Sequence, residues 1–181
     1  MQKVIGYKAF NIDMTDNYGN KYAEGQVYST KGEIKFGTNG FHMCKNIEDV
    51  FRYYDSFFKK INICEVRGTG ELSENFSFED DYYGYYDMYA VSKLEILKIL
   101  SYDNIIECFK KMPEFRLPRF IMGFDFQGEE MMYLINKYVV DNNYNVEIIR
   151  AIKSNLCIKY KTLNCKYVTD DNSYSKKKLI K

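Results

Sequence analysis

The first hundred residues carry a pattern of apolar and polar positions that predicts short strands around one helix. The predicted strands cover residues 4–10, 26–29 and 33–36. Apolar residues then recur at helical spacing between Ile47 and Phe58. Asn46 precedes this stripe as a capping residue, and Asp49 follows three residues later as its partner in a capping box, so a helix is predicted over 46–58.

Two further stretches lie between this helix and residue 100. Residues 61–66 are rich in β-branched side chains and predict a central strand, which the turn Gly68-Thr69-Gly70 is expected to end. Residues 89–100 carry apolar side chains at both odd and even positions. Their periodicity is therefore compatible with either a strand or a helix.

The chain after residue 100 is predicted to be mainly helical. Helices are expected after Asp103, over 128–142, and from Asn145 through Ile152. A loop with Pro113 and Pro118 separates the first two helices, and residues 156–168 alternate enough to predict a small hairpin before a basic tail.

These elements predict an α+β fold: a mixed or mainly antiparallel sheet packed by one capped helix, with a helical C-terminal region. The chain has 181 residues, and single domains usually run to about 100–200. We predict a domain at residues 1–100 and, packed on it, a helical extension at residues 101–181 with the short hairpin and the basic tail.

The net charge of the chain argues against one class of partner. With 26 basic and 25 acidic residues the formal charge is +1, so direct binding of nucleic acid is not expected. No apolar run approaches the ~18 residues that span a bilayer, and the first residues lack the apolar core of a signal peptide. The protein is predicted to be cytoplasmic and without a membrane partner.

The five cysteines are an odd number without a Cys-x-x-Cys pair. This usage predicts reduced thiols and argues against a zinc ribbon. Cys157 and Cys165 are spaced so that they can meet across the predicted hairpin, or they can be two separate core thiols.

His42 is the only histidine of the chain and lies in the stretch 40–46, between a predicted strand and the predicted helix. A lone histidine after a phenylalanine on a strand is typical of a packed, hydrogen-bonded structural residue. Cys44 shares its face of the strand and Cys64 can join from a neighbouring strand, but zinc requires four ligands or three plus water, so no metal site is predicted. A Cys-His nucleophile pair at the same residues lacks a third residue to orient it.

The most polarised part of the chain lies between Glu71 and Tyr89, where six acidic residues occur without a lysine or arginine. Its centre combines acids with tyrosines: Glu79, Asp80, Asp81, Tyr82, Tyr83, Tyr85 and Tyr86. One interpretation is a solvated loop. The other is an acidic, aromatic surface that binds a basic groove on a partner, because interface centres favour tyrosine and complementary charge speeds association.

Several motifs follow one another in the first half of the chain. They are GYKAFN at 6–11, DMT at 13–15, YxxGxxY at 22–28, GFHMCxN at 40–46, VFxYY at 50–54 and EVxGxGE at 65–71. This set, spanning about residues 5–100, resembles an uncharacterised domain family that is widespread in bacteriophage and prophage proteins. The resemblance implies a mobile-element origin, intracellular action and a strand after the last motif, which favours a strand over residues 91–99.

The order of elements also resembles that of small members of the ADP-ribosyltransferase superfamily. That resemblance implies NAD as cofactor, a residue that positions the nicotinamide ribose, an aromatic ring that stacks on the nicotinamide, and a glutamate that polarises the ribose. The candidates for these three roles are, in order, His42 or Lys8, Tyr53 or Tyr54, and Glu71 or Glu95. The first strand has Tyr7 and Lys8 where such enzymes usually place arginine or histidine.

The function predicted first is that of a phage-type accessory protein without a cofactor. Such a protein binds and modulates a host or defence-system protein or ribonucleoprotein, as an anti-defence inhibitor of the anti-CRISPR kind, through the acidic tyrosine-rich segment. The alternative is an NAD-dependent enzyme similar to ADP-ribosyltransferases, acting on a host protein or nucleic acid. The identity of the partner and the oligomeric state do not follow from the sequence.

Overall fold

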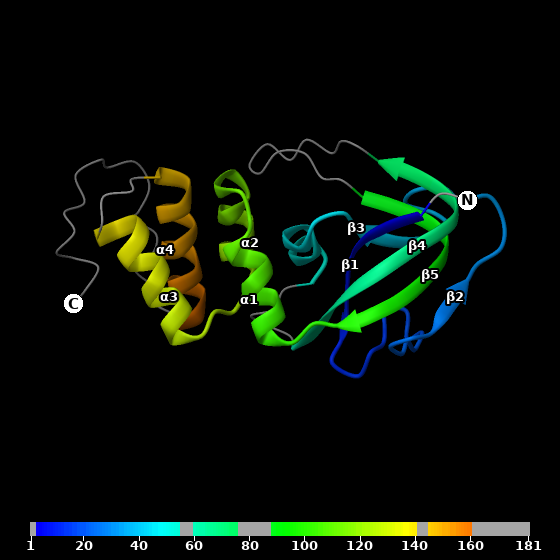
Figure 1. Ribbon diagram of the computed structural model, residues 1–181, viewed down its shortest axis with the longest axis horizontal. Helices are drawn as coiled ribbons and strands as arrows, with labels where there is room; N and C mark the ends of the chain where they lie inside the picture. Colours follow the sequence, from blue (N-terminus) through cyan, green and yellow to red (C-terminus); the bar gives the residue numbers. More distant parts are fainter. Residues whose placement is uncertain (1–2, 55–59, 76–87, 141–144, 161–181) are drawn as a thin grey trace. The chain divides into compact units, whose positions relative to one another are not determined.

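The computed structural model describes residues 3–54, 60–75, 88–140 and 145–160. They form an α+β fold in two compact units, Met1–Met112 and Pro113–Lys181 (Figure 1). The contact residues predicted at 79–86 lie outside the described residues, as do the part of the predicted hairpin beyond residue 160 and the basic tail.

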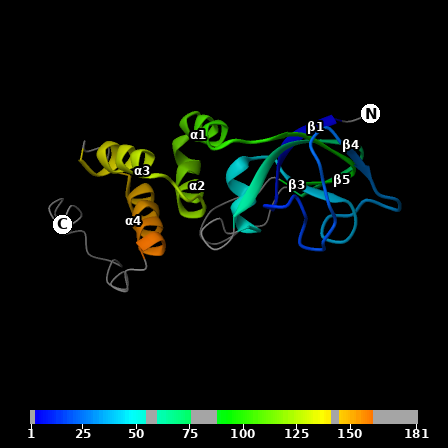
Figure 2. The same cartoon turned by 90° about the horizontal axis from the view of Figure 1, so that it is seen from below.

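The first unit is built on a five-stranded antiparallel sheet. Its strands are β1 (Lys3–Asn11), β2 (Val27–Ser29), β3 (Phe41–Cys44), β4 (Ile61–Asn75) and β5 (Met88–Ile99). They lie in the order β2-β5-β3-β1-β4, and β5 also pairs with β4. The strands β1, β3, β5 and β4 therefore form a closed ring, which explains the strong curl of the sheet (Figure 2).

The ring closes where β1 meets β3. Tyr7 pairs with Cys44 there, and the neighbouring Gly6 is buried against the other strand. A Cβ added to Gly6 would lie 2.3 Å from the carbonyl oxygen of Cys44 and 2.8 Å from Cε of Met43. Any side chain at residue 6 would push the two backbones apart, so this close approach requires glycine.

An apolar core fills the ring. Its buried members are Phe10, Met14, Tyr22, Met43, Cys64, Val66, Val91, Leu94 and Ile96. Leu94 and Ile96 are two residues apart on β5 and point to the same side, as the period of a strand requires. Because β1, β3, β4 and β5 all contribute, the core depends on the closure of the ring.

Strand β4 is longer than the sequence predicts. The prediction that a turn at Gly68-Thr69-Gly70 ends this strand is wrong, because β4 continues to pair with β5 as far as Asn75. The register shifts between Thr69 and Leu72, where Gly70 has a φ of 88°. Glycine permits this bulge, so these residues bend the strand instead of ending it.

Two other short elements of the first unit differ from the prediction. Residues 33–36 are not a strand but lead into a turn closed by a bridge between Lys35 and Asn39. The predicted helix is the shorter 3-10 helix η1 (Ile47–Arg52), and residues 55–59 lie outside the described part. Asn46 does not cap η1 with its side chain; its Nδ2 instead donates to Oδ2 of Asp49 (3.2 Å).

The strand predicted over residues 91–99 is confirmed as part of β5, and helix α1 (Tyr102–Lys110) follows it. The cap of α1 is Ser101, whose Oγ accepts from the backbone N–H of Asn104 (3.3 Å), and not the predicted Asp103. Helix α1 belongs to the first unit, which ends at Met112, whereas the sequence placed the boundary after residue 100.

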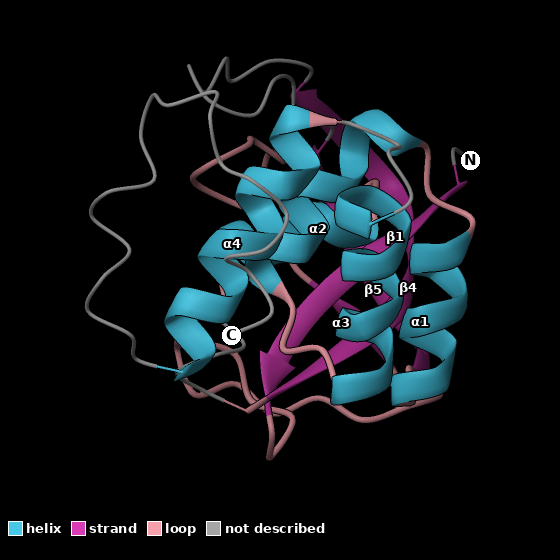
Figure 3. Cartoon of the chain, turned by 90° about the vertical axis from the view of Figure 1, so that its left-hand side faces the viewer, coloured by secondary structure: helices cyan, strands magenta, loops and turns pink. Residues whose placement is uncertain are grey.

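The described residues of the second unit are mainly helical. Its elements are η2 (Glu114–Arg116), α2 (Leu117–Gly123), α3 (Gly128–Ile135), the π-helical η3 (Asn136–Val140) and α4 (Val146–Tyr160). Helices α2 and α4 pack together (Figure 3), and the buried Asn155 of α4 donates to the carbonyl oxygens of Ile121 and Phe124.

The predicted cap of α4 is confirmed, since Oδ1 of Asn145 accepts from the backbone N–H of Ile148 (3.2 Å). The helix nevertheless runs to Tyr160, so residues 156–160 are not the first strand of a hairpin. Pro118 lies in the first turn of α2, not in a loop, because proline leaves no needed donor unsatisfied there.

The cysteines do not all match the predicted reduced state. Cys157 is disulfide-bonded, so the alternative that it is a separate core thiol is wrong. Cys44, Cys64 and Cys108 have free thiols. None of the helices in the described ranges is long and apolar enough to cross a membrane.

The close approach at Gly6 leads to a stability prediction. Gly6→Ala should lower the free energy of unfolding by about 3 kcal/mol, because the added methyl group collides with backbone that cannot move aside. Urea unfolding followed by circular dichroism measures the change. Gly128→Ala is the matched control, because nothing lies within 4 Å of the place where its Cβ would stand, and the change should stay below about 1 kcal/mol. Equal stability of the two variants would contradict the requirement for glycine at residue 6.

Candidate functional site

A cleft of about 790 Å³ lies in the first unit. Its walls come from β1, β2, β3, the end of η1, the loop at residues 16–22 and the turn between Lys35 and Asn39. Ligand sites in proteins usually measure ~300–1,000 Å³ and combine aromatic surface with a few polar groups. The cleft has both properties, so it is the candidate binding site of the domain.

Lys8 extends from β1 and lines the cleft. Its Nζ donates to the carbonyl oxygen of His42 (2.8 Å) and lies 5.6 Å from the centroid of the Phe10 ring. Burial lowers the pKa of the Lys8 amine, while the nearby Cys44 and Asp16 act in the opposite direction with smaller effects. The fold therefore holds this amine in poorly hydrated surroundings.

His42 projects from β3 and lines the same cleft. Its Nε2 accepts a hydrogen bond from the backbone N–H of Gly37 (2.9 Å), and its ring centroid lies 5.1 Å from that of Phe36, edge to face. An accepting Nε2 means that the ring is neutral with its proton on Nδ1. Burial lowers the pKa of His42, and the charge of Lys8 lowers it further. His42 thus holds the turn and offers Nδ1–H as a donor.

Three aromatic rings form a continuous row beside the cleft. The ring of Tyr22 lies 4.7 Å from that of Phe10 and 4.7 Å from that of Tyr28, measured between centroids. Both tyrosines line the cleft, and Tyr22 is almost fully buried. This row gives one wall an apolar surface of fixed shape.

Asp16 organises the loop at residues 16–22, which lines the cleft. Its carboxylate accepts from the backbone N–H groups of Tyr18 and Asn20 (both 2.9 Å) and from the hydroxyl of Tyr22 (3.1 Å). Burial raises the pKa of Asp16, but these hydrogen bonds outweigh it and lower the pKa overall. The carboxylate is already bound on several sides, so its role in this structure is to hold the loop.

Tyr53 and Tyr54 follow η1 and complete the aromatic lining. Tyr53 is 48% exposed and its hydroxyl donates to Sδ of Met88 (3.0 Å). Burial raises the pKa of Tyr54, and the charges of Asp16 and Tyr18 contribute, which places Tyr54 near the loop. Both residues therefore contribute to the lining of the cleft.

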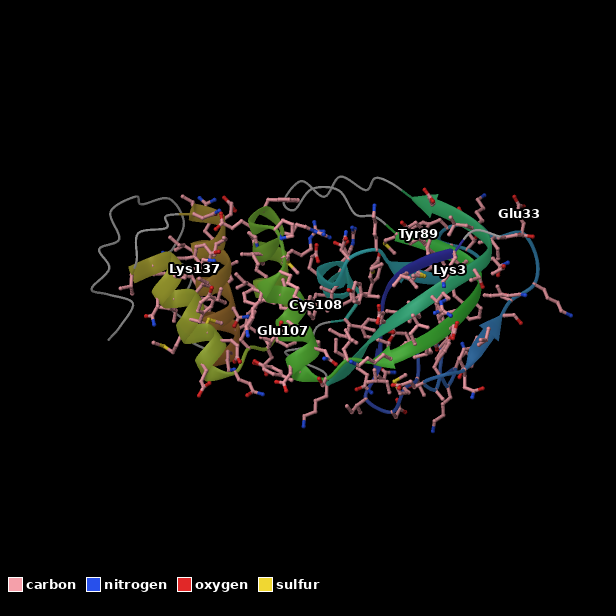
Figure 4. The ribbon with its side chains drawn as sticks, in the orientation of Figure 1. Lys3, Glu33, Tyr89, Glu107, Cys108 and Lys137 are labelled. Carbon is pink, nitrogen blue, oxygen red and sulfur yellow. The ribbon has the colours of Figure 1, made fainter. Side chains whose placement is uncertain are left out.

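The structure brings together four of the residues predicted for an NAD site. Lys8, His42, Tyr53 and Tyr54 all line the one cleft, although they come from β1, β3 and the end of η1. Tyr7, the neighbour of Lys8, also lines the cleft, but its hydroxyl contacts Cys108: burial raises the pKa of Tyr7 to about 12, and the charge of Cys108 and a hydrogen bond with Cys108 contribute. Figure 4 labels Cys108 on α1.

The two predicted catalytic glutamates are not brought to the cleft. Oε2 of Glu95 pairs with Nη1 of Arg67 (2.8 Å) across β4 and β5, and Glu71 is exposed on β4. Neither residue is among those that line the cleft. The two candidate glutamates therefore do not share the cleft with His42, because they lie elsewhere on β4 and β5.

Sequence analysis considered a zinc site and a Cys-His nucleophile pair, and the described ranges show no arrangement of residues that fits either one. No group of three or more His, Cys, Asp or Glu residues there is placed to hold a metal ion. Burial raises the pKa of the Cys64 thiol to about 12, with a smaller effect from Glu24. Cys64 therefore stays protonated at neutral pH and is neither a good ligand nor a good nucleophile.

Sequence reasoning missed Asp16, Tyr22 and Tyr28 as parts of the site. Asp16 begins a loop of Asn and Gly residues, and an aspartate in that position often accepts from the backbone two residues on. Tyr22 and Tyr28 belong to the YxxGxxY motif, but nothing local indicates that their rings meet. Only the folded sheet shows that these residues share a wall with Lys8.

A comparison with protein families matches residues 4–107 to a domain of unknown function, DUF7666. The chain belongs to this family. Comparisons with curated proteins and with solved structures find no match. The residues lining the cleft lie between Tyr7 and Met88, so the whole cleft is part of the DUF7666 domain.

The hydrogen bond of His42 leads to a pH prediction. The folded pKa of His42 is below its unfolded value of about 6.5, so its contribution to stability is complete above that pH and is lost as the pH falls through the folded pKa. Urea unfolding between pH 7.5 and 5 should therefore show falling stability. His42→Gln is the control and should show a weaker dependence, because glutamine does not titrate. An equal dependence in both proteins would rule out His42 as the titrating group.

Proposed function

We propose that the DUF7666 domain of this chain binds NAD in the cleft between β1, β3 and η1. The observation that carries the proposal is the convergence of Lys8, His42, Tyr53 and Tyr54 on one cavity of about 790 Å³. The resemblance to ADP-ribosyltransferases, which rests on the order of elements predicted from the sequence, implies these four residues as candidates for an NAD site. The size of the cavity falls within the range of ligand sites, which accommodates a nucleotide.

The chemistry of the lining matches the parts of this ligand. The nicotinamide ring is planar and stacks on Tyr54 or Tyr53, since aromatic faces bind flat heterocycles. The hydroxyl groups of the adjoining ribose accept hydrogen bonds from Nζ of Lys8 and from Nδ1–H of His42. The neutral state of His42 leaves that donor in place at neutral pH.

The transfer of ADP-ribose to a host protein or nucleic acid is the reaction that the resemblance to ADP-ribosyltransferases implies. Such a reaction needs a carboxylate near the ribose, and Glu71 and Glu95 do not line the cleft. Asp16 does line it, but its oxygens accept from Tyr18, Asn20 and Tyr22. The geometry therefore supports binding of NAD more directly than it supports transfer.

Calorimetric titration of the full chain with NAD tests the proposal. Tyr54→Ala should weaken binding about tenfold or more, because stacking of one ring contributes ~1–3 kcal/mol. Tyr54→Phe keeps the ring and should bind like the unchanged protein. Glu95→Gln, which lies outside the cleft, should also leave the affinity unchanged. Absence of NAD binding to the unchanged protein would refute the proposal, and equal affinities of Tyr54→Ala and Tyr54→Phe would refute the stacking role.

We also propose that the chain is a phage or mobile-element accessory protein, whose acidic tyrosine-rich segment contacts a host or defence-system macromolecule. The supporting observation is the run of acids and tyrosines at residues 79–86. Asn75 of β4, which precedes the segment, is paired with Met88 of β5, which follows it. Met88 also lines the cleft.

Charge reversal tests this second proposal. In an affinity pull-down from the native host, the double variant Asp80→Lys with Asp81→Lys should fail to recover a partner that the unchanged protein recovers. The reason is that complementary charge governs association. Lys110→Glu with Lys111→Glu, on the exposed end of α1, is the matched control and should keep that partner. Recovery of the same partners by both double variants would rule out the acidic segment as the contact.

A further inference from the structure

The ammonium group of Lys8 has no carboxylate partner within ion-pairing distance in the described part of the chain. Its one hydrogen-bond acceptor there is the carbonyl oxygen of His42, at 2.8 Å. The carboxylate of Asp16 faces Lys8 from the loop, but that group is engaged by Asn20 and Tyr22. Lys8 is half-buried, and a partly desolvated charge without a close counter-charge is costly, so the surroundings favour the neutral amine more than water does.

The titratable groups around Lys8 agree with this geometry. Cys44, Asp16 and His42 face it, from β3 and from the loop. Burial is the largest influence on both groups: it lowers the pKa of Lys8 and the pKa of His42, and the charge of Lys8 lowers the pKa of His42 further. A lysine that is desolvated in an apolar pocket is the usual form of an amine nucleophile in proteins.

We infer that Lys8 is a carbonyl-reactive residue that forms an imine with an aldehyde or ketone bound in the cleft. The site has what such a reaction needs: a cavity that admits the carbonyl compound, an amine that lines it, and aromatic rings at Tyr22, Tyr28 and Tyr54 to hold an unsaturated or ring-bearing ligand. This activity goes beyond NAD binding, although it rests on the same cleft.

The reaction balances without an oxidant or a further cofactor. The lone pair of the neutral Nζ attacks the carbonyl carbon, the C=O π bond breaks, and proton transfer from nitrogen to oxygen gives a carbinolamine. Loss of the hydroxyl group with a second proton from nitrogen releases one water and leaves a C=N bond. The free amine and the carbonyl compound are regenerated when water adds back.

Pyridoxal 5′-phosphate is a suitable probe because it is an aromatic aldehyde that forms imines with amines. The full chain is incubated at pH 7 with less than one equivalent of the probe and reduced with borohydride, and the labelled peptides are mapped by mass spectrometry. The inference predicts that Lys8 carries more label than the exposed Lys93 of β5. The main labelled peptide should be absent from the map of Lys8→Arg and present in the map of Lys93→Arg.

Two outcomes overturn the inference: label spread over the exposed lysines, or Lys8 labelled less than Lys93. Peptide mapping of the unchanged protein decides between the outcomes even if Lys8→Arg fails to fold. Addition of NAD separates this inference from the proposed function. If NAD binds but Lys8 is not labelled preferentially, only the inference fails. If Lys8 is labelled preferentially and NAD neither binds nor protects it, only the proposed NAD site fails.

Discussion

The close contact between β1 and β3 at Gly6 is the constraint on which the rest of the domain depends. Because residue 6 has no side chain, the carbonyl oxygen of Cys44 can approach its backbone, and the ring of strands closes. Closure removes two sheet edges and encloses the apolar core. It also places Lys8 of β1 beside His42 of β3, joined by the 2.8 Å hydrogen bond from Nζ to the carbonyl oxygen of His42. The cleft is thus a consequence of how the sheet closes.

The electrostatics of the cleft follow from the same arrangement. Lys8 and His42 share poorly hydrated surroundings, and the nearest carboxylate, Asp16, is held by its own loop. Each of the two basic groups is therefore biased toward its neutral form. The neutral His42 serves as acceptor for Gly37, which fixes one wall of the cleft. The stability of that wall and the capacity of the cleft to bind a ligand therefore both depend on the neutral state of His42.

Much of the fold was accessible from the sequence, because local patterns determine strands and helices. Apolar positions followed by a turn indicated β1, and the cap at Asn145 indicated α4. The extent of β4 was not accessible, since Gly68 and Gly70 are turn residues in local terms, whereas alongside β5 Gly68 pairs within the strand and Gly70 lies in a bulge. The candidate site shows the same division: motifs indicate Lys8 and His42, whereas the cross-strand pair of Glu95 with Arg67 is a tertiary contact that no motif encodes.

The single histidine of the chain allows a direct test of the central claim that the cleft binds NAD. His42 is the only histidine among 181 residues, so the imidazole region of the proton NMR spectrum reports on this one ring. If NAD binds in the cleft, titration with NAD to about 1 mM, the upper end of usual Michaelis constants, should shift the His42 resonances in a saturable way. Resonances that stay fixed through the titration would contradict the claim that NAD binds beside His42.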